Sequence, residues 1–585
     1  MKVKLENENF QEDYVVNLLK ARGVEDIEDF LHPDPAFIQS WKDLDNIMEG
    51  IALLDKKIKE KAKMALIVDC DVDGVTSSSI IYQYIRGLDQ TIQIDYYIHS
   101  GKQHGLEDMW DKLADNDYGL IIIPDAGTND KEYAEKIPCD ILIIDHHDYE
   151  GGGIAENCVV INNQMSPNYK NKSLCGAGLA FQFCRGLDEY YGINKADYYI
   201  DLAALGICAD MMSGLEVENQ SFWKEGFAKI NNYMFMTIAR KQAYSITGKM
   251  NATDEDVIAA LNPTSVAFYI VPMINAMIRV GSQSEKERLF MAFINGHQMV
   301  PSNKRGAKGT FEEVAVESVR ECTNARTRQN KIKDNAVGAI EAKIFKNDLL
   351  ENKILFIRLD EDDDFPSTLN GLVAAQLCAQ YKRPTIVARL NNEGYIRGSI
   401  RGVDNSKLES FKNFLISTDM FEYVQGHDNA AGCSIHNKSL FDFHKKANLM
   451  LEDYDFGENH YKINFQRSSF DSDILPMIRD IGYYKTIWSQ KNNEPKIHIT
   501  DIHISPADVQ IMGKNKDTIK FVINGVAYIQ FRAGKLIEEL KEKGDVSMEI
   551  IGTANLNEYN GIITPQIFIQ NYELVEEDVM DLISF

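Results

Sequence analysis

Three aspartates with alternating spacing form the pattern in this chain that is most suited to chemistry. Asp69, Asp71 and Asp73 come directly after the apolar run 64–68, which predicts a buried parallel strand, and residues from 75 onward predict a helix. Alternate residues of an extended loop point the same way, so we expect the three carboxylates to converge at the carboxyl end of the strand. Carboxylates this close repel one another unless a cation neutralises them. The spacing therefore predicts a site for a hard metal ion.

Two other interpretations of these aspartates stay open, an acidic surface turn and a calcium-binding loop. A loop of the EF-hand kind has glycine at its sixth position and glutamate at its twelfth. Gly74 stands at the sixth position, but the twelfth is Ile80, and a strand rather than a helix precedes the loop. A catalytic metal site is the interpretation we favour.

Three further predicted elements end in groups that bind metals. The apolar runs 120–123 and 141–144 lead to Asp125 and to the triplet 145–147, Asp-His-His, and an apolar helix ends at Asp210. Oxygen ligands with a minority of imidazole suit manganese or magnesium better than zinc. Four such ends in one region of alternating strands and helices make the metal site a strong prediction.

At these residues the sequence resembles the DHH phosphoesterases, a family named for the triplet at 145–147, and within it the RecJ single-strand-specific exonucleases. The resemblance runs with gaps over most of the chain. It implies two divalent ions, Mn²⁺ or Mg²⁺, held by Asp71, Asp73, Asp125, His146 and Asp210, with Asp69 close by. It also implies that His147 contacts or supports the scissile phosphate, so His147, Asp125 and Asp73 are the expected catalytic residues.

Composition describes an ordinary soluble globular protein of three or four domains. The 585 residues are 44% hydrophobic and 26% charged, and nine cysteines are scattered without a Cys-x-x-Cys pair, which fits a reducing cytosol. Residues 1–6 start no signal peptide, and no apolar run approaches the roughly 20 residues of a membrane span. We therefore expect a cytoplasmic protein without a membrane partner. The net charge of −26 argues that any contact with nucleic acid is local.

The expected fold class is α/β, with a parallel-sheet catalytic domain and further smaller domains. The predicted order is a helical lead-in, the DHH catalytic domain, a helical connector, a smaller α/β DHH-associated substrate-binding domain, and a linker with a C-terminal β-barrel that resembles an OB-fold. The expected boundaries are 1–60, 61–235, 236–340, 341–455 and 456–585.

Candidate substrate-binding residues come from three segments outside the metal motifs. Residues 272–279 resemble a RecJ segment whose asparagine and arginine reach DNA, and a glycine-flanked histidine near 427 is typical of backbone that approaches a phosphate. Aromatic and basic side chains of an OB-fold bind single strands by stacking and charge, although the aromatic ones can equally fill the barrel. The candidates are Asn275, Arg279, Ser399, Arg401, Gly426, His427, Tyr528, Arg532 and Tyr559.

One loop departs from the family pattern. RecJ proteins carry an arginine between the first two metal motifs, where it holds a 5′ phosphate, whereas residues 96–106 contain none. Lys102 and His99 are the candidate replacements, and lysine offers a point charge rather than a planar fork. We therefore expect a weak preference for a 5′ phosphate.

The resemblance implies hydrolysis of single-stranded DNA from its 5′ end to mononucleotides, in recombination and repair, by a monomer that works with a single-strand-binding protein or a helicase. Two cations in such a site lower the pKa of a bound water. One alternative is a DHH phosphodiesterase for short RNA or cyclic dinucleotides, which would leave about 250 residues without a role. The other is a DNA-binding replication factor that has lost catalysis; such loss removes metal ligands, and none is missing here.

Overall fold

The computed structural model describes residues 1–99, 101, 104–360, 363, 365–513, 515–559 and 561–575, with only the backbone described for Tyr559. The chain divides into two compact units. One comprises residues 28–332 and 486–492 and is called the catalytic unit below. The other comprises residues 1–27, 333–485 and 493–585 and is called the accessory unit.

The catalytic unit is built on a five-stranded parallel sheet in the order β3-β2-β4-β5-β6. The strands are β2 (Met64–Val68), β3 (Ile94–Ile98), β4 (Leu120–Pro124), β5 (Asp140–Asp145) and β6 (Cys158–Asn162). Strands β2 and β4 are buried along their whole length because helices cover both faces of the sheet. The predicted parallel sheet is confirmed.

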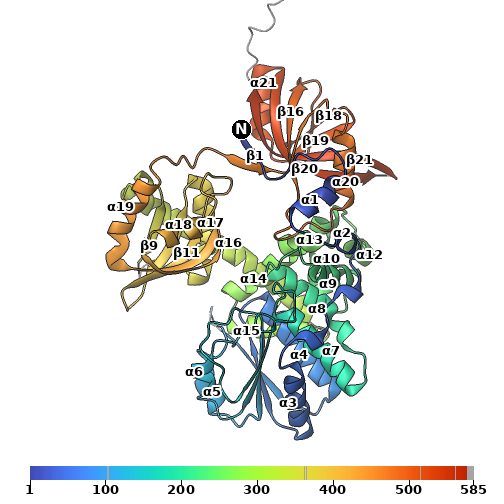
Figure 1. Ribbon diagram of the computed structural model, residues 1–585, viewed down its shortest axis with the longest axis vertical. Helices are drawn as coiled ribbons and strands as arrows, with labels where there is room; N and C mark the ends of the chain where they lie inside the picture. Colours follow the sequence, from blue (N-terminus) through green and yellow to red (C-terminus); the bar gives the residue numbers. More distant parts are fainter. Residues whose placement is uncertain are drawn as a thin grey trace, which may run out of the picture. The chain divides into compact units, whose positions relative to one another are not determined.

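Alternate residues of each strand enter two separate cores. Leu66, Ile122 and Leu142 pack on one side with the long helices, and Ile67, Ile121 and Ile143 pack on the other with two short ones. Figure 1 shows α3 and α4 on one face of this sheet and α5 and α6 on the other. The helices are α3 (Ile47–Lys59), α4 (Val72–Leu88), α7 (Gly176–Tyr191) and α8 (Ile200–Ala209) on the first side, and α5 (Trp110–Ala114) and α6 (Lys131–Ala134) on the second.

Helices continue the catalytic unit beyond the sheet. They are α9 (Val217–Ala228), α10 (Tyr233–Lys241), α11 (Ala243–Thr247), α12 (Asp254–Ala260), α13 (Pro263–Ser265), α14 (Val271–Val280), α15 (Gln283–Asn295) and α16 (Val314–Lys346), with a π-helical turn at Val266–Ile270 and a small hairpin of β7 (Met299–Pro301) and β8 (Phe311–Glu313). Among the described residues, one helical stretch, Pro263–Val280, is long and apolar enough to cross a membrane, and 56% of it is buried. Its Ile274 and Met277 are part of the main core, so it serves here as a core helix.

The accessory unit contains two larger sheets. A five-stranded sheet has the order β12-β13-β11-β10-β9, and a seven-stranded sheet has the order β15-β16-β20-β21-β19-β18-β17. The first sheet consists of β9 (Leu355–Leu359), β10 (Thr385–Leu390), β11 (Tyr395–Arg401), β12 (Phe421–His427) and β13 (Ala430–His436), with α17 (Asn370–Tyr381), α18 (Phe411–Ser417) and α19 (Leu440–Met450). The second consists of β15 (Phe465–Ser468), β16 (Lys496–Ile504), β17 (Gln510–Met512), β18 (Thr518–Ile523), β19 (Val526–Gln530), β20 (Val546–Tyr559) and β21 (Ile562–Val575), with α20 (Ile474–Tyr483) and α21 (Gly534–Lys543).

The first residues of the chain are not all a helical lead-in. Strand β1 (Lys2–Leu5) pairs in parallel with β14 (His460–Ile463), and the backbone N–H of Val15 in α1 (Tyr14–Ala21) donates to Asp480 of α20 at 3.0 Å. Residues 1–27 therefore belong to the accessory unit, whereas 28–60, with α2 (Ile27–Leu31) at the junction, lead into the catalytic sheet. Pairing with a strand more than 450 residues away leaves no periodic signal in residues 1–27 themselves.

Candidate metal centre

The loop between β2 and α4 places three carboxylates where β2 ends. Asp69 follows the strand and is 2% exposed, and Asp71 caps α4 by accepting a hydrogen bond from the backbone N–H of Gly74 at 2.8 Å. Helix α4 begins at Val72, three residues before the predicted start, so Asp73 lies in its first turn. The carboxylates converge because a capped helix begins among them, and not because the loop is extended throughout.

Asp73 is held by the start of a second helix. Its carboxylate accepts hydrogen bonds from the backbone N–H groups of Gly176 at 2.7 Å and Ala177 at 2.9 Å, and from the Cys175 thiol at 3.0 Å. The first turn of α7 favours an anion at this point. The spacing of the sequence did not reveal this contact, since 102 residues separate Asp73 from Cys175.

The other strand ends supply the remaining groups. His146, after β5, brings its Nε2 to 3.2 Å from Asp125 Oδ1 and 3.5 Å from Asp210 Oδ2, and Asp210 ends helix α8. Asp125, after β4, has a φ of +70°, a left-handed conformation that is uncommon for residues other than glycine. Ligand atoms within 4.8 Å of one another form one group of Asp69, Asp71 and Asp125, and another of Asp73, His146 and Asp210. All six predicted ligands therefore lie together.

The electrostatics of this cluster call for cations. Burial, with Asp69 and Asp73 adding to it, raises the pKa of Asp71 to about 6, and burial with Asp73 and Asp71 raises the pKa of Asp210 to about 8. Burial raises the pKa of Asp125 well above its usual range. Among the described residues, Asp69 Oδ1 and Asp125 Oδ1 are buried without accepting a hydrogen bond. Buried carboxylate oxygens that lack donors are the ligands that divalent cations prefer, so these residues would fit two such ions.

Asp145 differs from the other carboxylates because both of its oxygens accept hydrogen bonds. Its Oδ1 accepts from His147 Nδ1 at 2.8 Å and from the backbone N–H of His146 at 2.7 Å, and its Oδ2 accepts from the backbone N–H of Thr128 at 3.0 Å. The hydrogen bond to Asp145 raises the pKa of His147 to about 9. His147 is therefore a cation fixed by Asp145, and Asp125, His146 and His147 form a third group of close ligand atoms.

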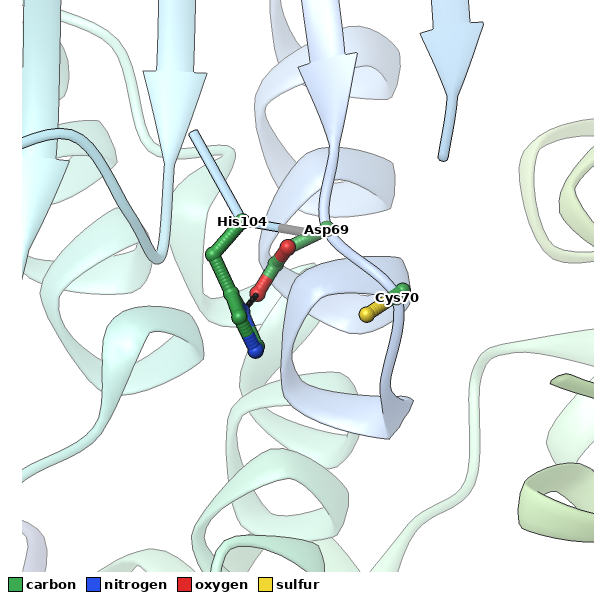
Figure 2. A group of neighbouring side chains, drawn as sticks. All are labelled: Asp69, Cys70 and His104. Atoms are coloured by element: carbon green, nitrogen blue, oxygen red, sulfur yellow. Dashed lines mark hydrogen bonds and ion pairs between the residues drawn. The ribbon is translucent and has the colours of Figure 1, made fainter. Parts of the chain in front are cut away.

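His104 is a member of the site that spacing did not reveal. Its Nδ1 lies 2.6 Å from Asp69 Oδ2, and Figure 2 shows the two side chains joined at the end of β2 with Cys70 beside them. His99 instead lies buried with its Nδ1 2.8 Å from Asp108, so it does not present a cation to a phosphate as expected. Lys102 lies outside the described residues.

The two predicted DNA contacts of the catalytic unit lie on α14. Arg279 and Asn275 are one turn apart and partly exposed. Burial lowers the pKa of Arg279, and the charge of the Asp71 carboxylate opposes that effect.

Four predicted contacts lie in the five-stranded sheet of the accessory unit. Arg401 on β11 and His427 on β12 both pair with Ala430 of β13, the strand between them, so they flank a small residue on one face. Ser399 pairs with Gly432 on the same face. Gly426 has a φ of +129°, and an added Cβ would lie 2.9 Å from the carbonyl oxygen of Ala430, so the position requires glycine.

The three predicted DNA contacts in the seven-stranded sheet lie in different environments. Tyr528 is fully buried and stacks on Phe521 with ring centroids 5.1 Å apart. It fills the core and has no face for a base, which corrects the expectation that it contacts a strand. Arg532 is exposed after β19. Tyr559 ends β20, and its side chain lies outside the described part of the chain.

Comparisons with known proteins agree with this geometry. Residues 63–207 match the model of the DHH family, N-terminal domain, and residues 485–571 match that of the RecJ OB domain. A Bacillus subtilis protein whose name describes an SPbeta prophage-derived single-strand DNA-specific exonuclease, YorK, is 35% identical over 587 residues, which cover 98% of each chain. The chain belongs to the RecJ-like DHH family.

Two further proteins are similar to this chain at lower identity. The single-stranded-DNA-specific exonuclease RecJ of Bacillus subtilis is 24% identical over 97% of this chain and 69% of its own. The crystal structure of RecJ from Thermus thermophilus in complex with Mn²⁺ has a TM-score of 0.69 at 18% identity, over 98% of this chain and 79% of that one. The fold of the RecJ-like family is therefore shared along the whole chain, and the predicted α/β class with a C-terminal OB domain is confirmed.

Proposed function

We propose that this chain is a metal-dependent exonuclease that hydrolyses single-stranded DNA from the 5′ end and releases mononucleotides, in DNA recombination and repair. The observation that carries the proposal is the pair of ligand groups at the strand ends, with buried carboxylate oxygens that accept no hydrogen bond among the described residues. The names of the relatives support the substrate. The direction of cleavage rests on the family resemblance.

The residues of the site divide the work. Asp69, Asp71, Asp73, Asp125, His146 and Asp210 would hold two Mn²⁺ or Mg²⁺ ions, for which solved structures of RecJ from Thermus thermophilus with each metal give support. Bound there, two such ions activate water and stabilise the leaving oxygen. His147, kept protonated by Asp145, offers an N–H to a phosphate oxygen. Arg279, whose pKa responds to the charge of Asp71, would add a second cation for the substrate.

Two other functions fit less well. A phosphodiesterase for short RNA or cyclic dinucleotides has no use for the OB domain at 485–571. A replication factor without catalysis does not need six intact ligands, two of which carry a buried oxygen that accepts no hydrogen bond among the described residues.

We further propose a cytoplasmic monomer that receives its substrate from a single-strand-binding protein or a helicase. The proposed domains keep the expected boundaries 61–235, 236–340, 341–455 and 456–585, whereas residues 1–27 of the expected lead-in 1–60 are assigned to the accessory unit. Ser399, Arg401, Gly426 and His427 would bind DNA phosphates, and Asn275 and Arg532 would contact the strand. The face that Arg401 and His427 share across Ala430 supports this assignment.

The test is cleavage of end-labelled single strands of both polarities with and without Mn²⁺. We expect mononucleotides from the 5′ end only, and Asp125→Asn should lower kcat/KM by at least about a hundredfold because a proposed metal ligand loses its charge. The matched control is Asp140→Asn at the start of β5, where the carboxylate pairs with Lys57 at 2.8 Å, far along the strand from the site. Unchanged turnover in Asp125→Asn would contradict the two-metal assignment.

A further inference from the structure

Cys70 stands between two proposed metal ligands and has no part in the proposed chemistry. Its Sγ, a ring nitrogen of His104 and a carboxylate oxygen of Asp69 all lie within 4.8 Å of one another. Figure 2 shows Asp69 and Cys70 on the loop that follows β2, with His104 approaching from a neighbouring segment. One sulfur, one nitrogen and one oxygen make a donor set unlike the oxygen-rich sets of the catalytic groups.

Two features of these side chains favour the binding of a cation. The hydrogen bond between His104 Nδ1 and Asp69 Oδ2, at 2.6 Å, already holds a nitrogen and an oxygen ligand atom side by side, so a cation that replaces the shared proton would bind both. The second feature is Asp69 Oδ1, which is buried and accepts no hydrogen bond within the described residues.

We propose that Asp69, Cys70 and His104 form a third metal site, which takes Zn²⁺ or another cation with affinity for thiolate, and that its occupation withdraws Asp69 from the catalytic centre. Sulfur and imidazole together select zinc over manganese and magnesium. The metal site stands on its own residues, whereas the loss of activity rests on the proposed nuclease function.

Binding a zinc ion would require only a small movement of these three side chains. With Zn–S near 2.3 Å and Zn–N and Zn–O near 2.0–2.2 Å, tetrahedral ligand atoms lie about 3.3–3.8 Å apart, roughly 1 Å closer than the present limit of 4.8 Å. The His104 side chain is 55% exposed, so it can supply the movement. Water would complete the coordination, and the thiol proton would pass to solvent as the sulfur binds.

The test uses the full chain, stripped of metal and titrated with Co²⁺ as the probe for a zinc site. We expect the near-ultraviolet thiolate-to-cobalt charge-transfer band in the wild type and its loss in both Cys70→Ser and Cys70→Ala. His104→Gln should bind Co²⁺ at least about tenfold more weakly. The matched control is Cys158→Ser, a half-buried cysteine that belongs to none of the close ligand groups found among the described residues, and it should keep the band.

A second measurement addresses the catalytic consequence. With Mn²⁺ saturating, added Zn²⁺ should inhibit wild type and Cys158→Ser, and the ratio of rates with and without Zn²⁺ should rise towards one in Cys70→Ser. No charge-transfer band in the wild type, or a band that persists in both Cys70 variants, would overturn the site. A band in a protein without any nuclease activity would instead leave the site in place and refute the proposed function.

Discussion

Among the residues of the centre, Asp145 and Asp125 show how different surroundings give identical side chains different roles. Asp145 is surrounded by donors, and although burial opposes it, the hydrogen bond from His147 keeps the pKa of Asp145 well below its usual range. Asp125 is equally buried but faces other carboxylates, which together with burial raise its pKa. Asp145 is therefore an anion that fixes a histidine, whereas Asp125 faces like charges that a bound cation would offset.

The Asp145–His147 pair gives a prediction for stability against pH in the metal-free protein. The pKa of His147 rises from 6.5 to about 9, so the stability from the pair is fully present below pH 6.5 and is lost as the pH rises through about 9. Because the His147 side chain is 52% exposed, the contribution should be at most about 1 kcal/mol. Thermal unfolding in EDTA should therefore show wild type above His147→Gln at pH 6, with the difference vanishing above pH 9.

The exposed His32 provides the control for that comparison. It lies 3.9 Å from Glu28 with both side chains largely exposed, so His32→Gln should leave the unfolding temperature unchanged at both pH values. A difference between wild type and His147→Gln that grows from pH 6 to pH 9 would contradict the assignment of His147 as a cation.

At the scale of elements, helices set the metal centre as much as strands do. A Cβ added to Gly176, the first residue of α7, would lie 2.5 Å from Asp125 Oδ1 and 2.6 Å from Asp125 Cβ. One added to Gly206 of α8 would lie 2.5 Å from Asp73 Oδ1. The helices approach the strand ends so closely that only glycine leaves room for the carboxylates.

This packing predicts that Gly176→Ala damages catalysis more than stability. Displacing Asp125 by a fraction of an ångström to about 1 Å should lower kcat/KM about a hundredfold. Gly87→Ala is the matched control, because an added Cβ in the last turn of α4 meets nothing within 4 Å. Rates on a short labelled strand, with unfolding temperatures for both variants, make the comparison. Equal rates in the two variants would show that the centre tolerates the shift.

The segment between β3 and α5 predicts how the enzyme treats a 5′ phosphate. His99 is buried against Asp108 and His104 is engaged by Asp69, so neither described histidine of the segment is placed to replace the family's arginine. We expect kcat/KM on 5′-phosphorylated and 5′-hydroxyl strands to agree within about tenfold, less than the loss of a typical charge-assisted contact. A hundredfold preference for the phosphate would show that another group holds it.

The sequence alone predicts the proposed ligands of the centre but not the groups that contact those ligands. An aspartate after a buried run such as 64–68 can be placed at a sheet edge because parallel strands end together. The contacts of Cys175 with Asp73 and of His104 with Asp69 join segments with no mutual periodicity, so only the fold reveals them. The burial of Tyr528 could not be predicted for a related reason, since strand alternation alone does not say which face of a curved sheet is the inner one.

At the scale of the whole molecule, the proposed substrate contacts come from two units, and the long helix α16 runs from the catalytic unit into the accessory unit. The acidic net charge of −26 predicts that any attraction for DNA depends on local groups of exposed cations. Residues 1–27 help to build the accessory unit through β1, so truncation is a poor test of its role. Single substitutions on its surface are a better one.

Arg532 provides that test, because it is exposed after β19 beside Phe531, which is 60% exposed. If Arg532 neutralises one phosphate, Arg532→Ala should flatten the slope of log K against log salt by about 0.7 for a long single strand. Cleavage of a very short oligonucleotide, which engages the catalytic unit alone, should keep its kcat/KM. Tyr528→Phe is the matched control, because it removes a buried hydroxyl that has no hydrogen-bond partner among the described residues and so should leave the salt slope unchanged. An unchanged slope in Arg532→Ala, or equal losses on long and short strands, would show that this surface does not track DNA.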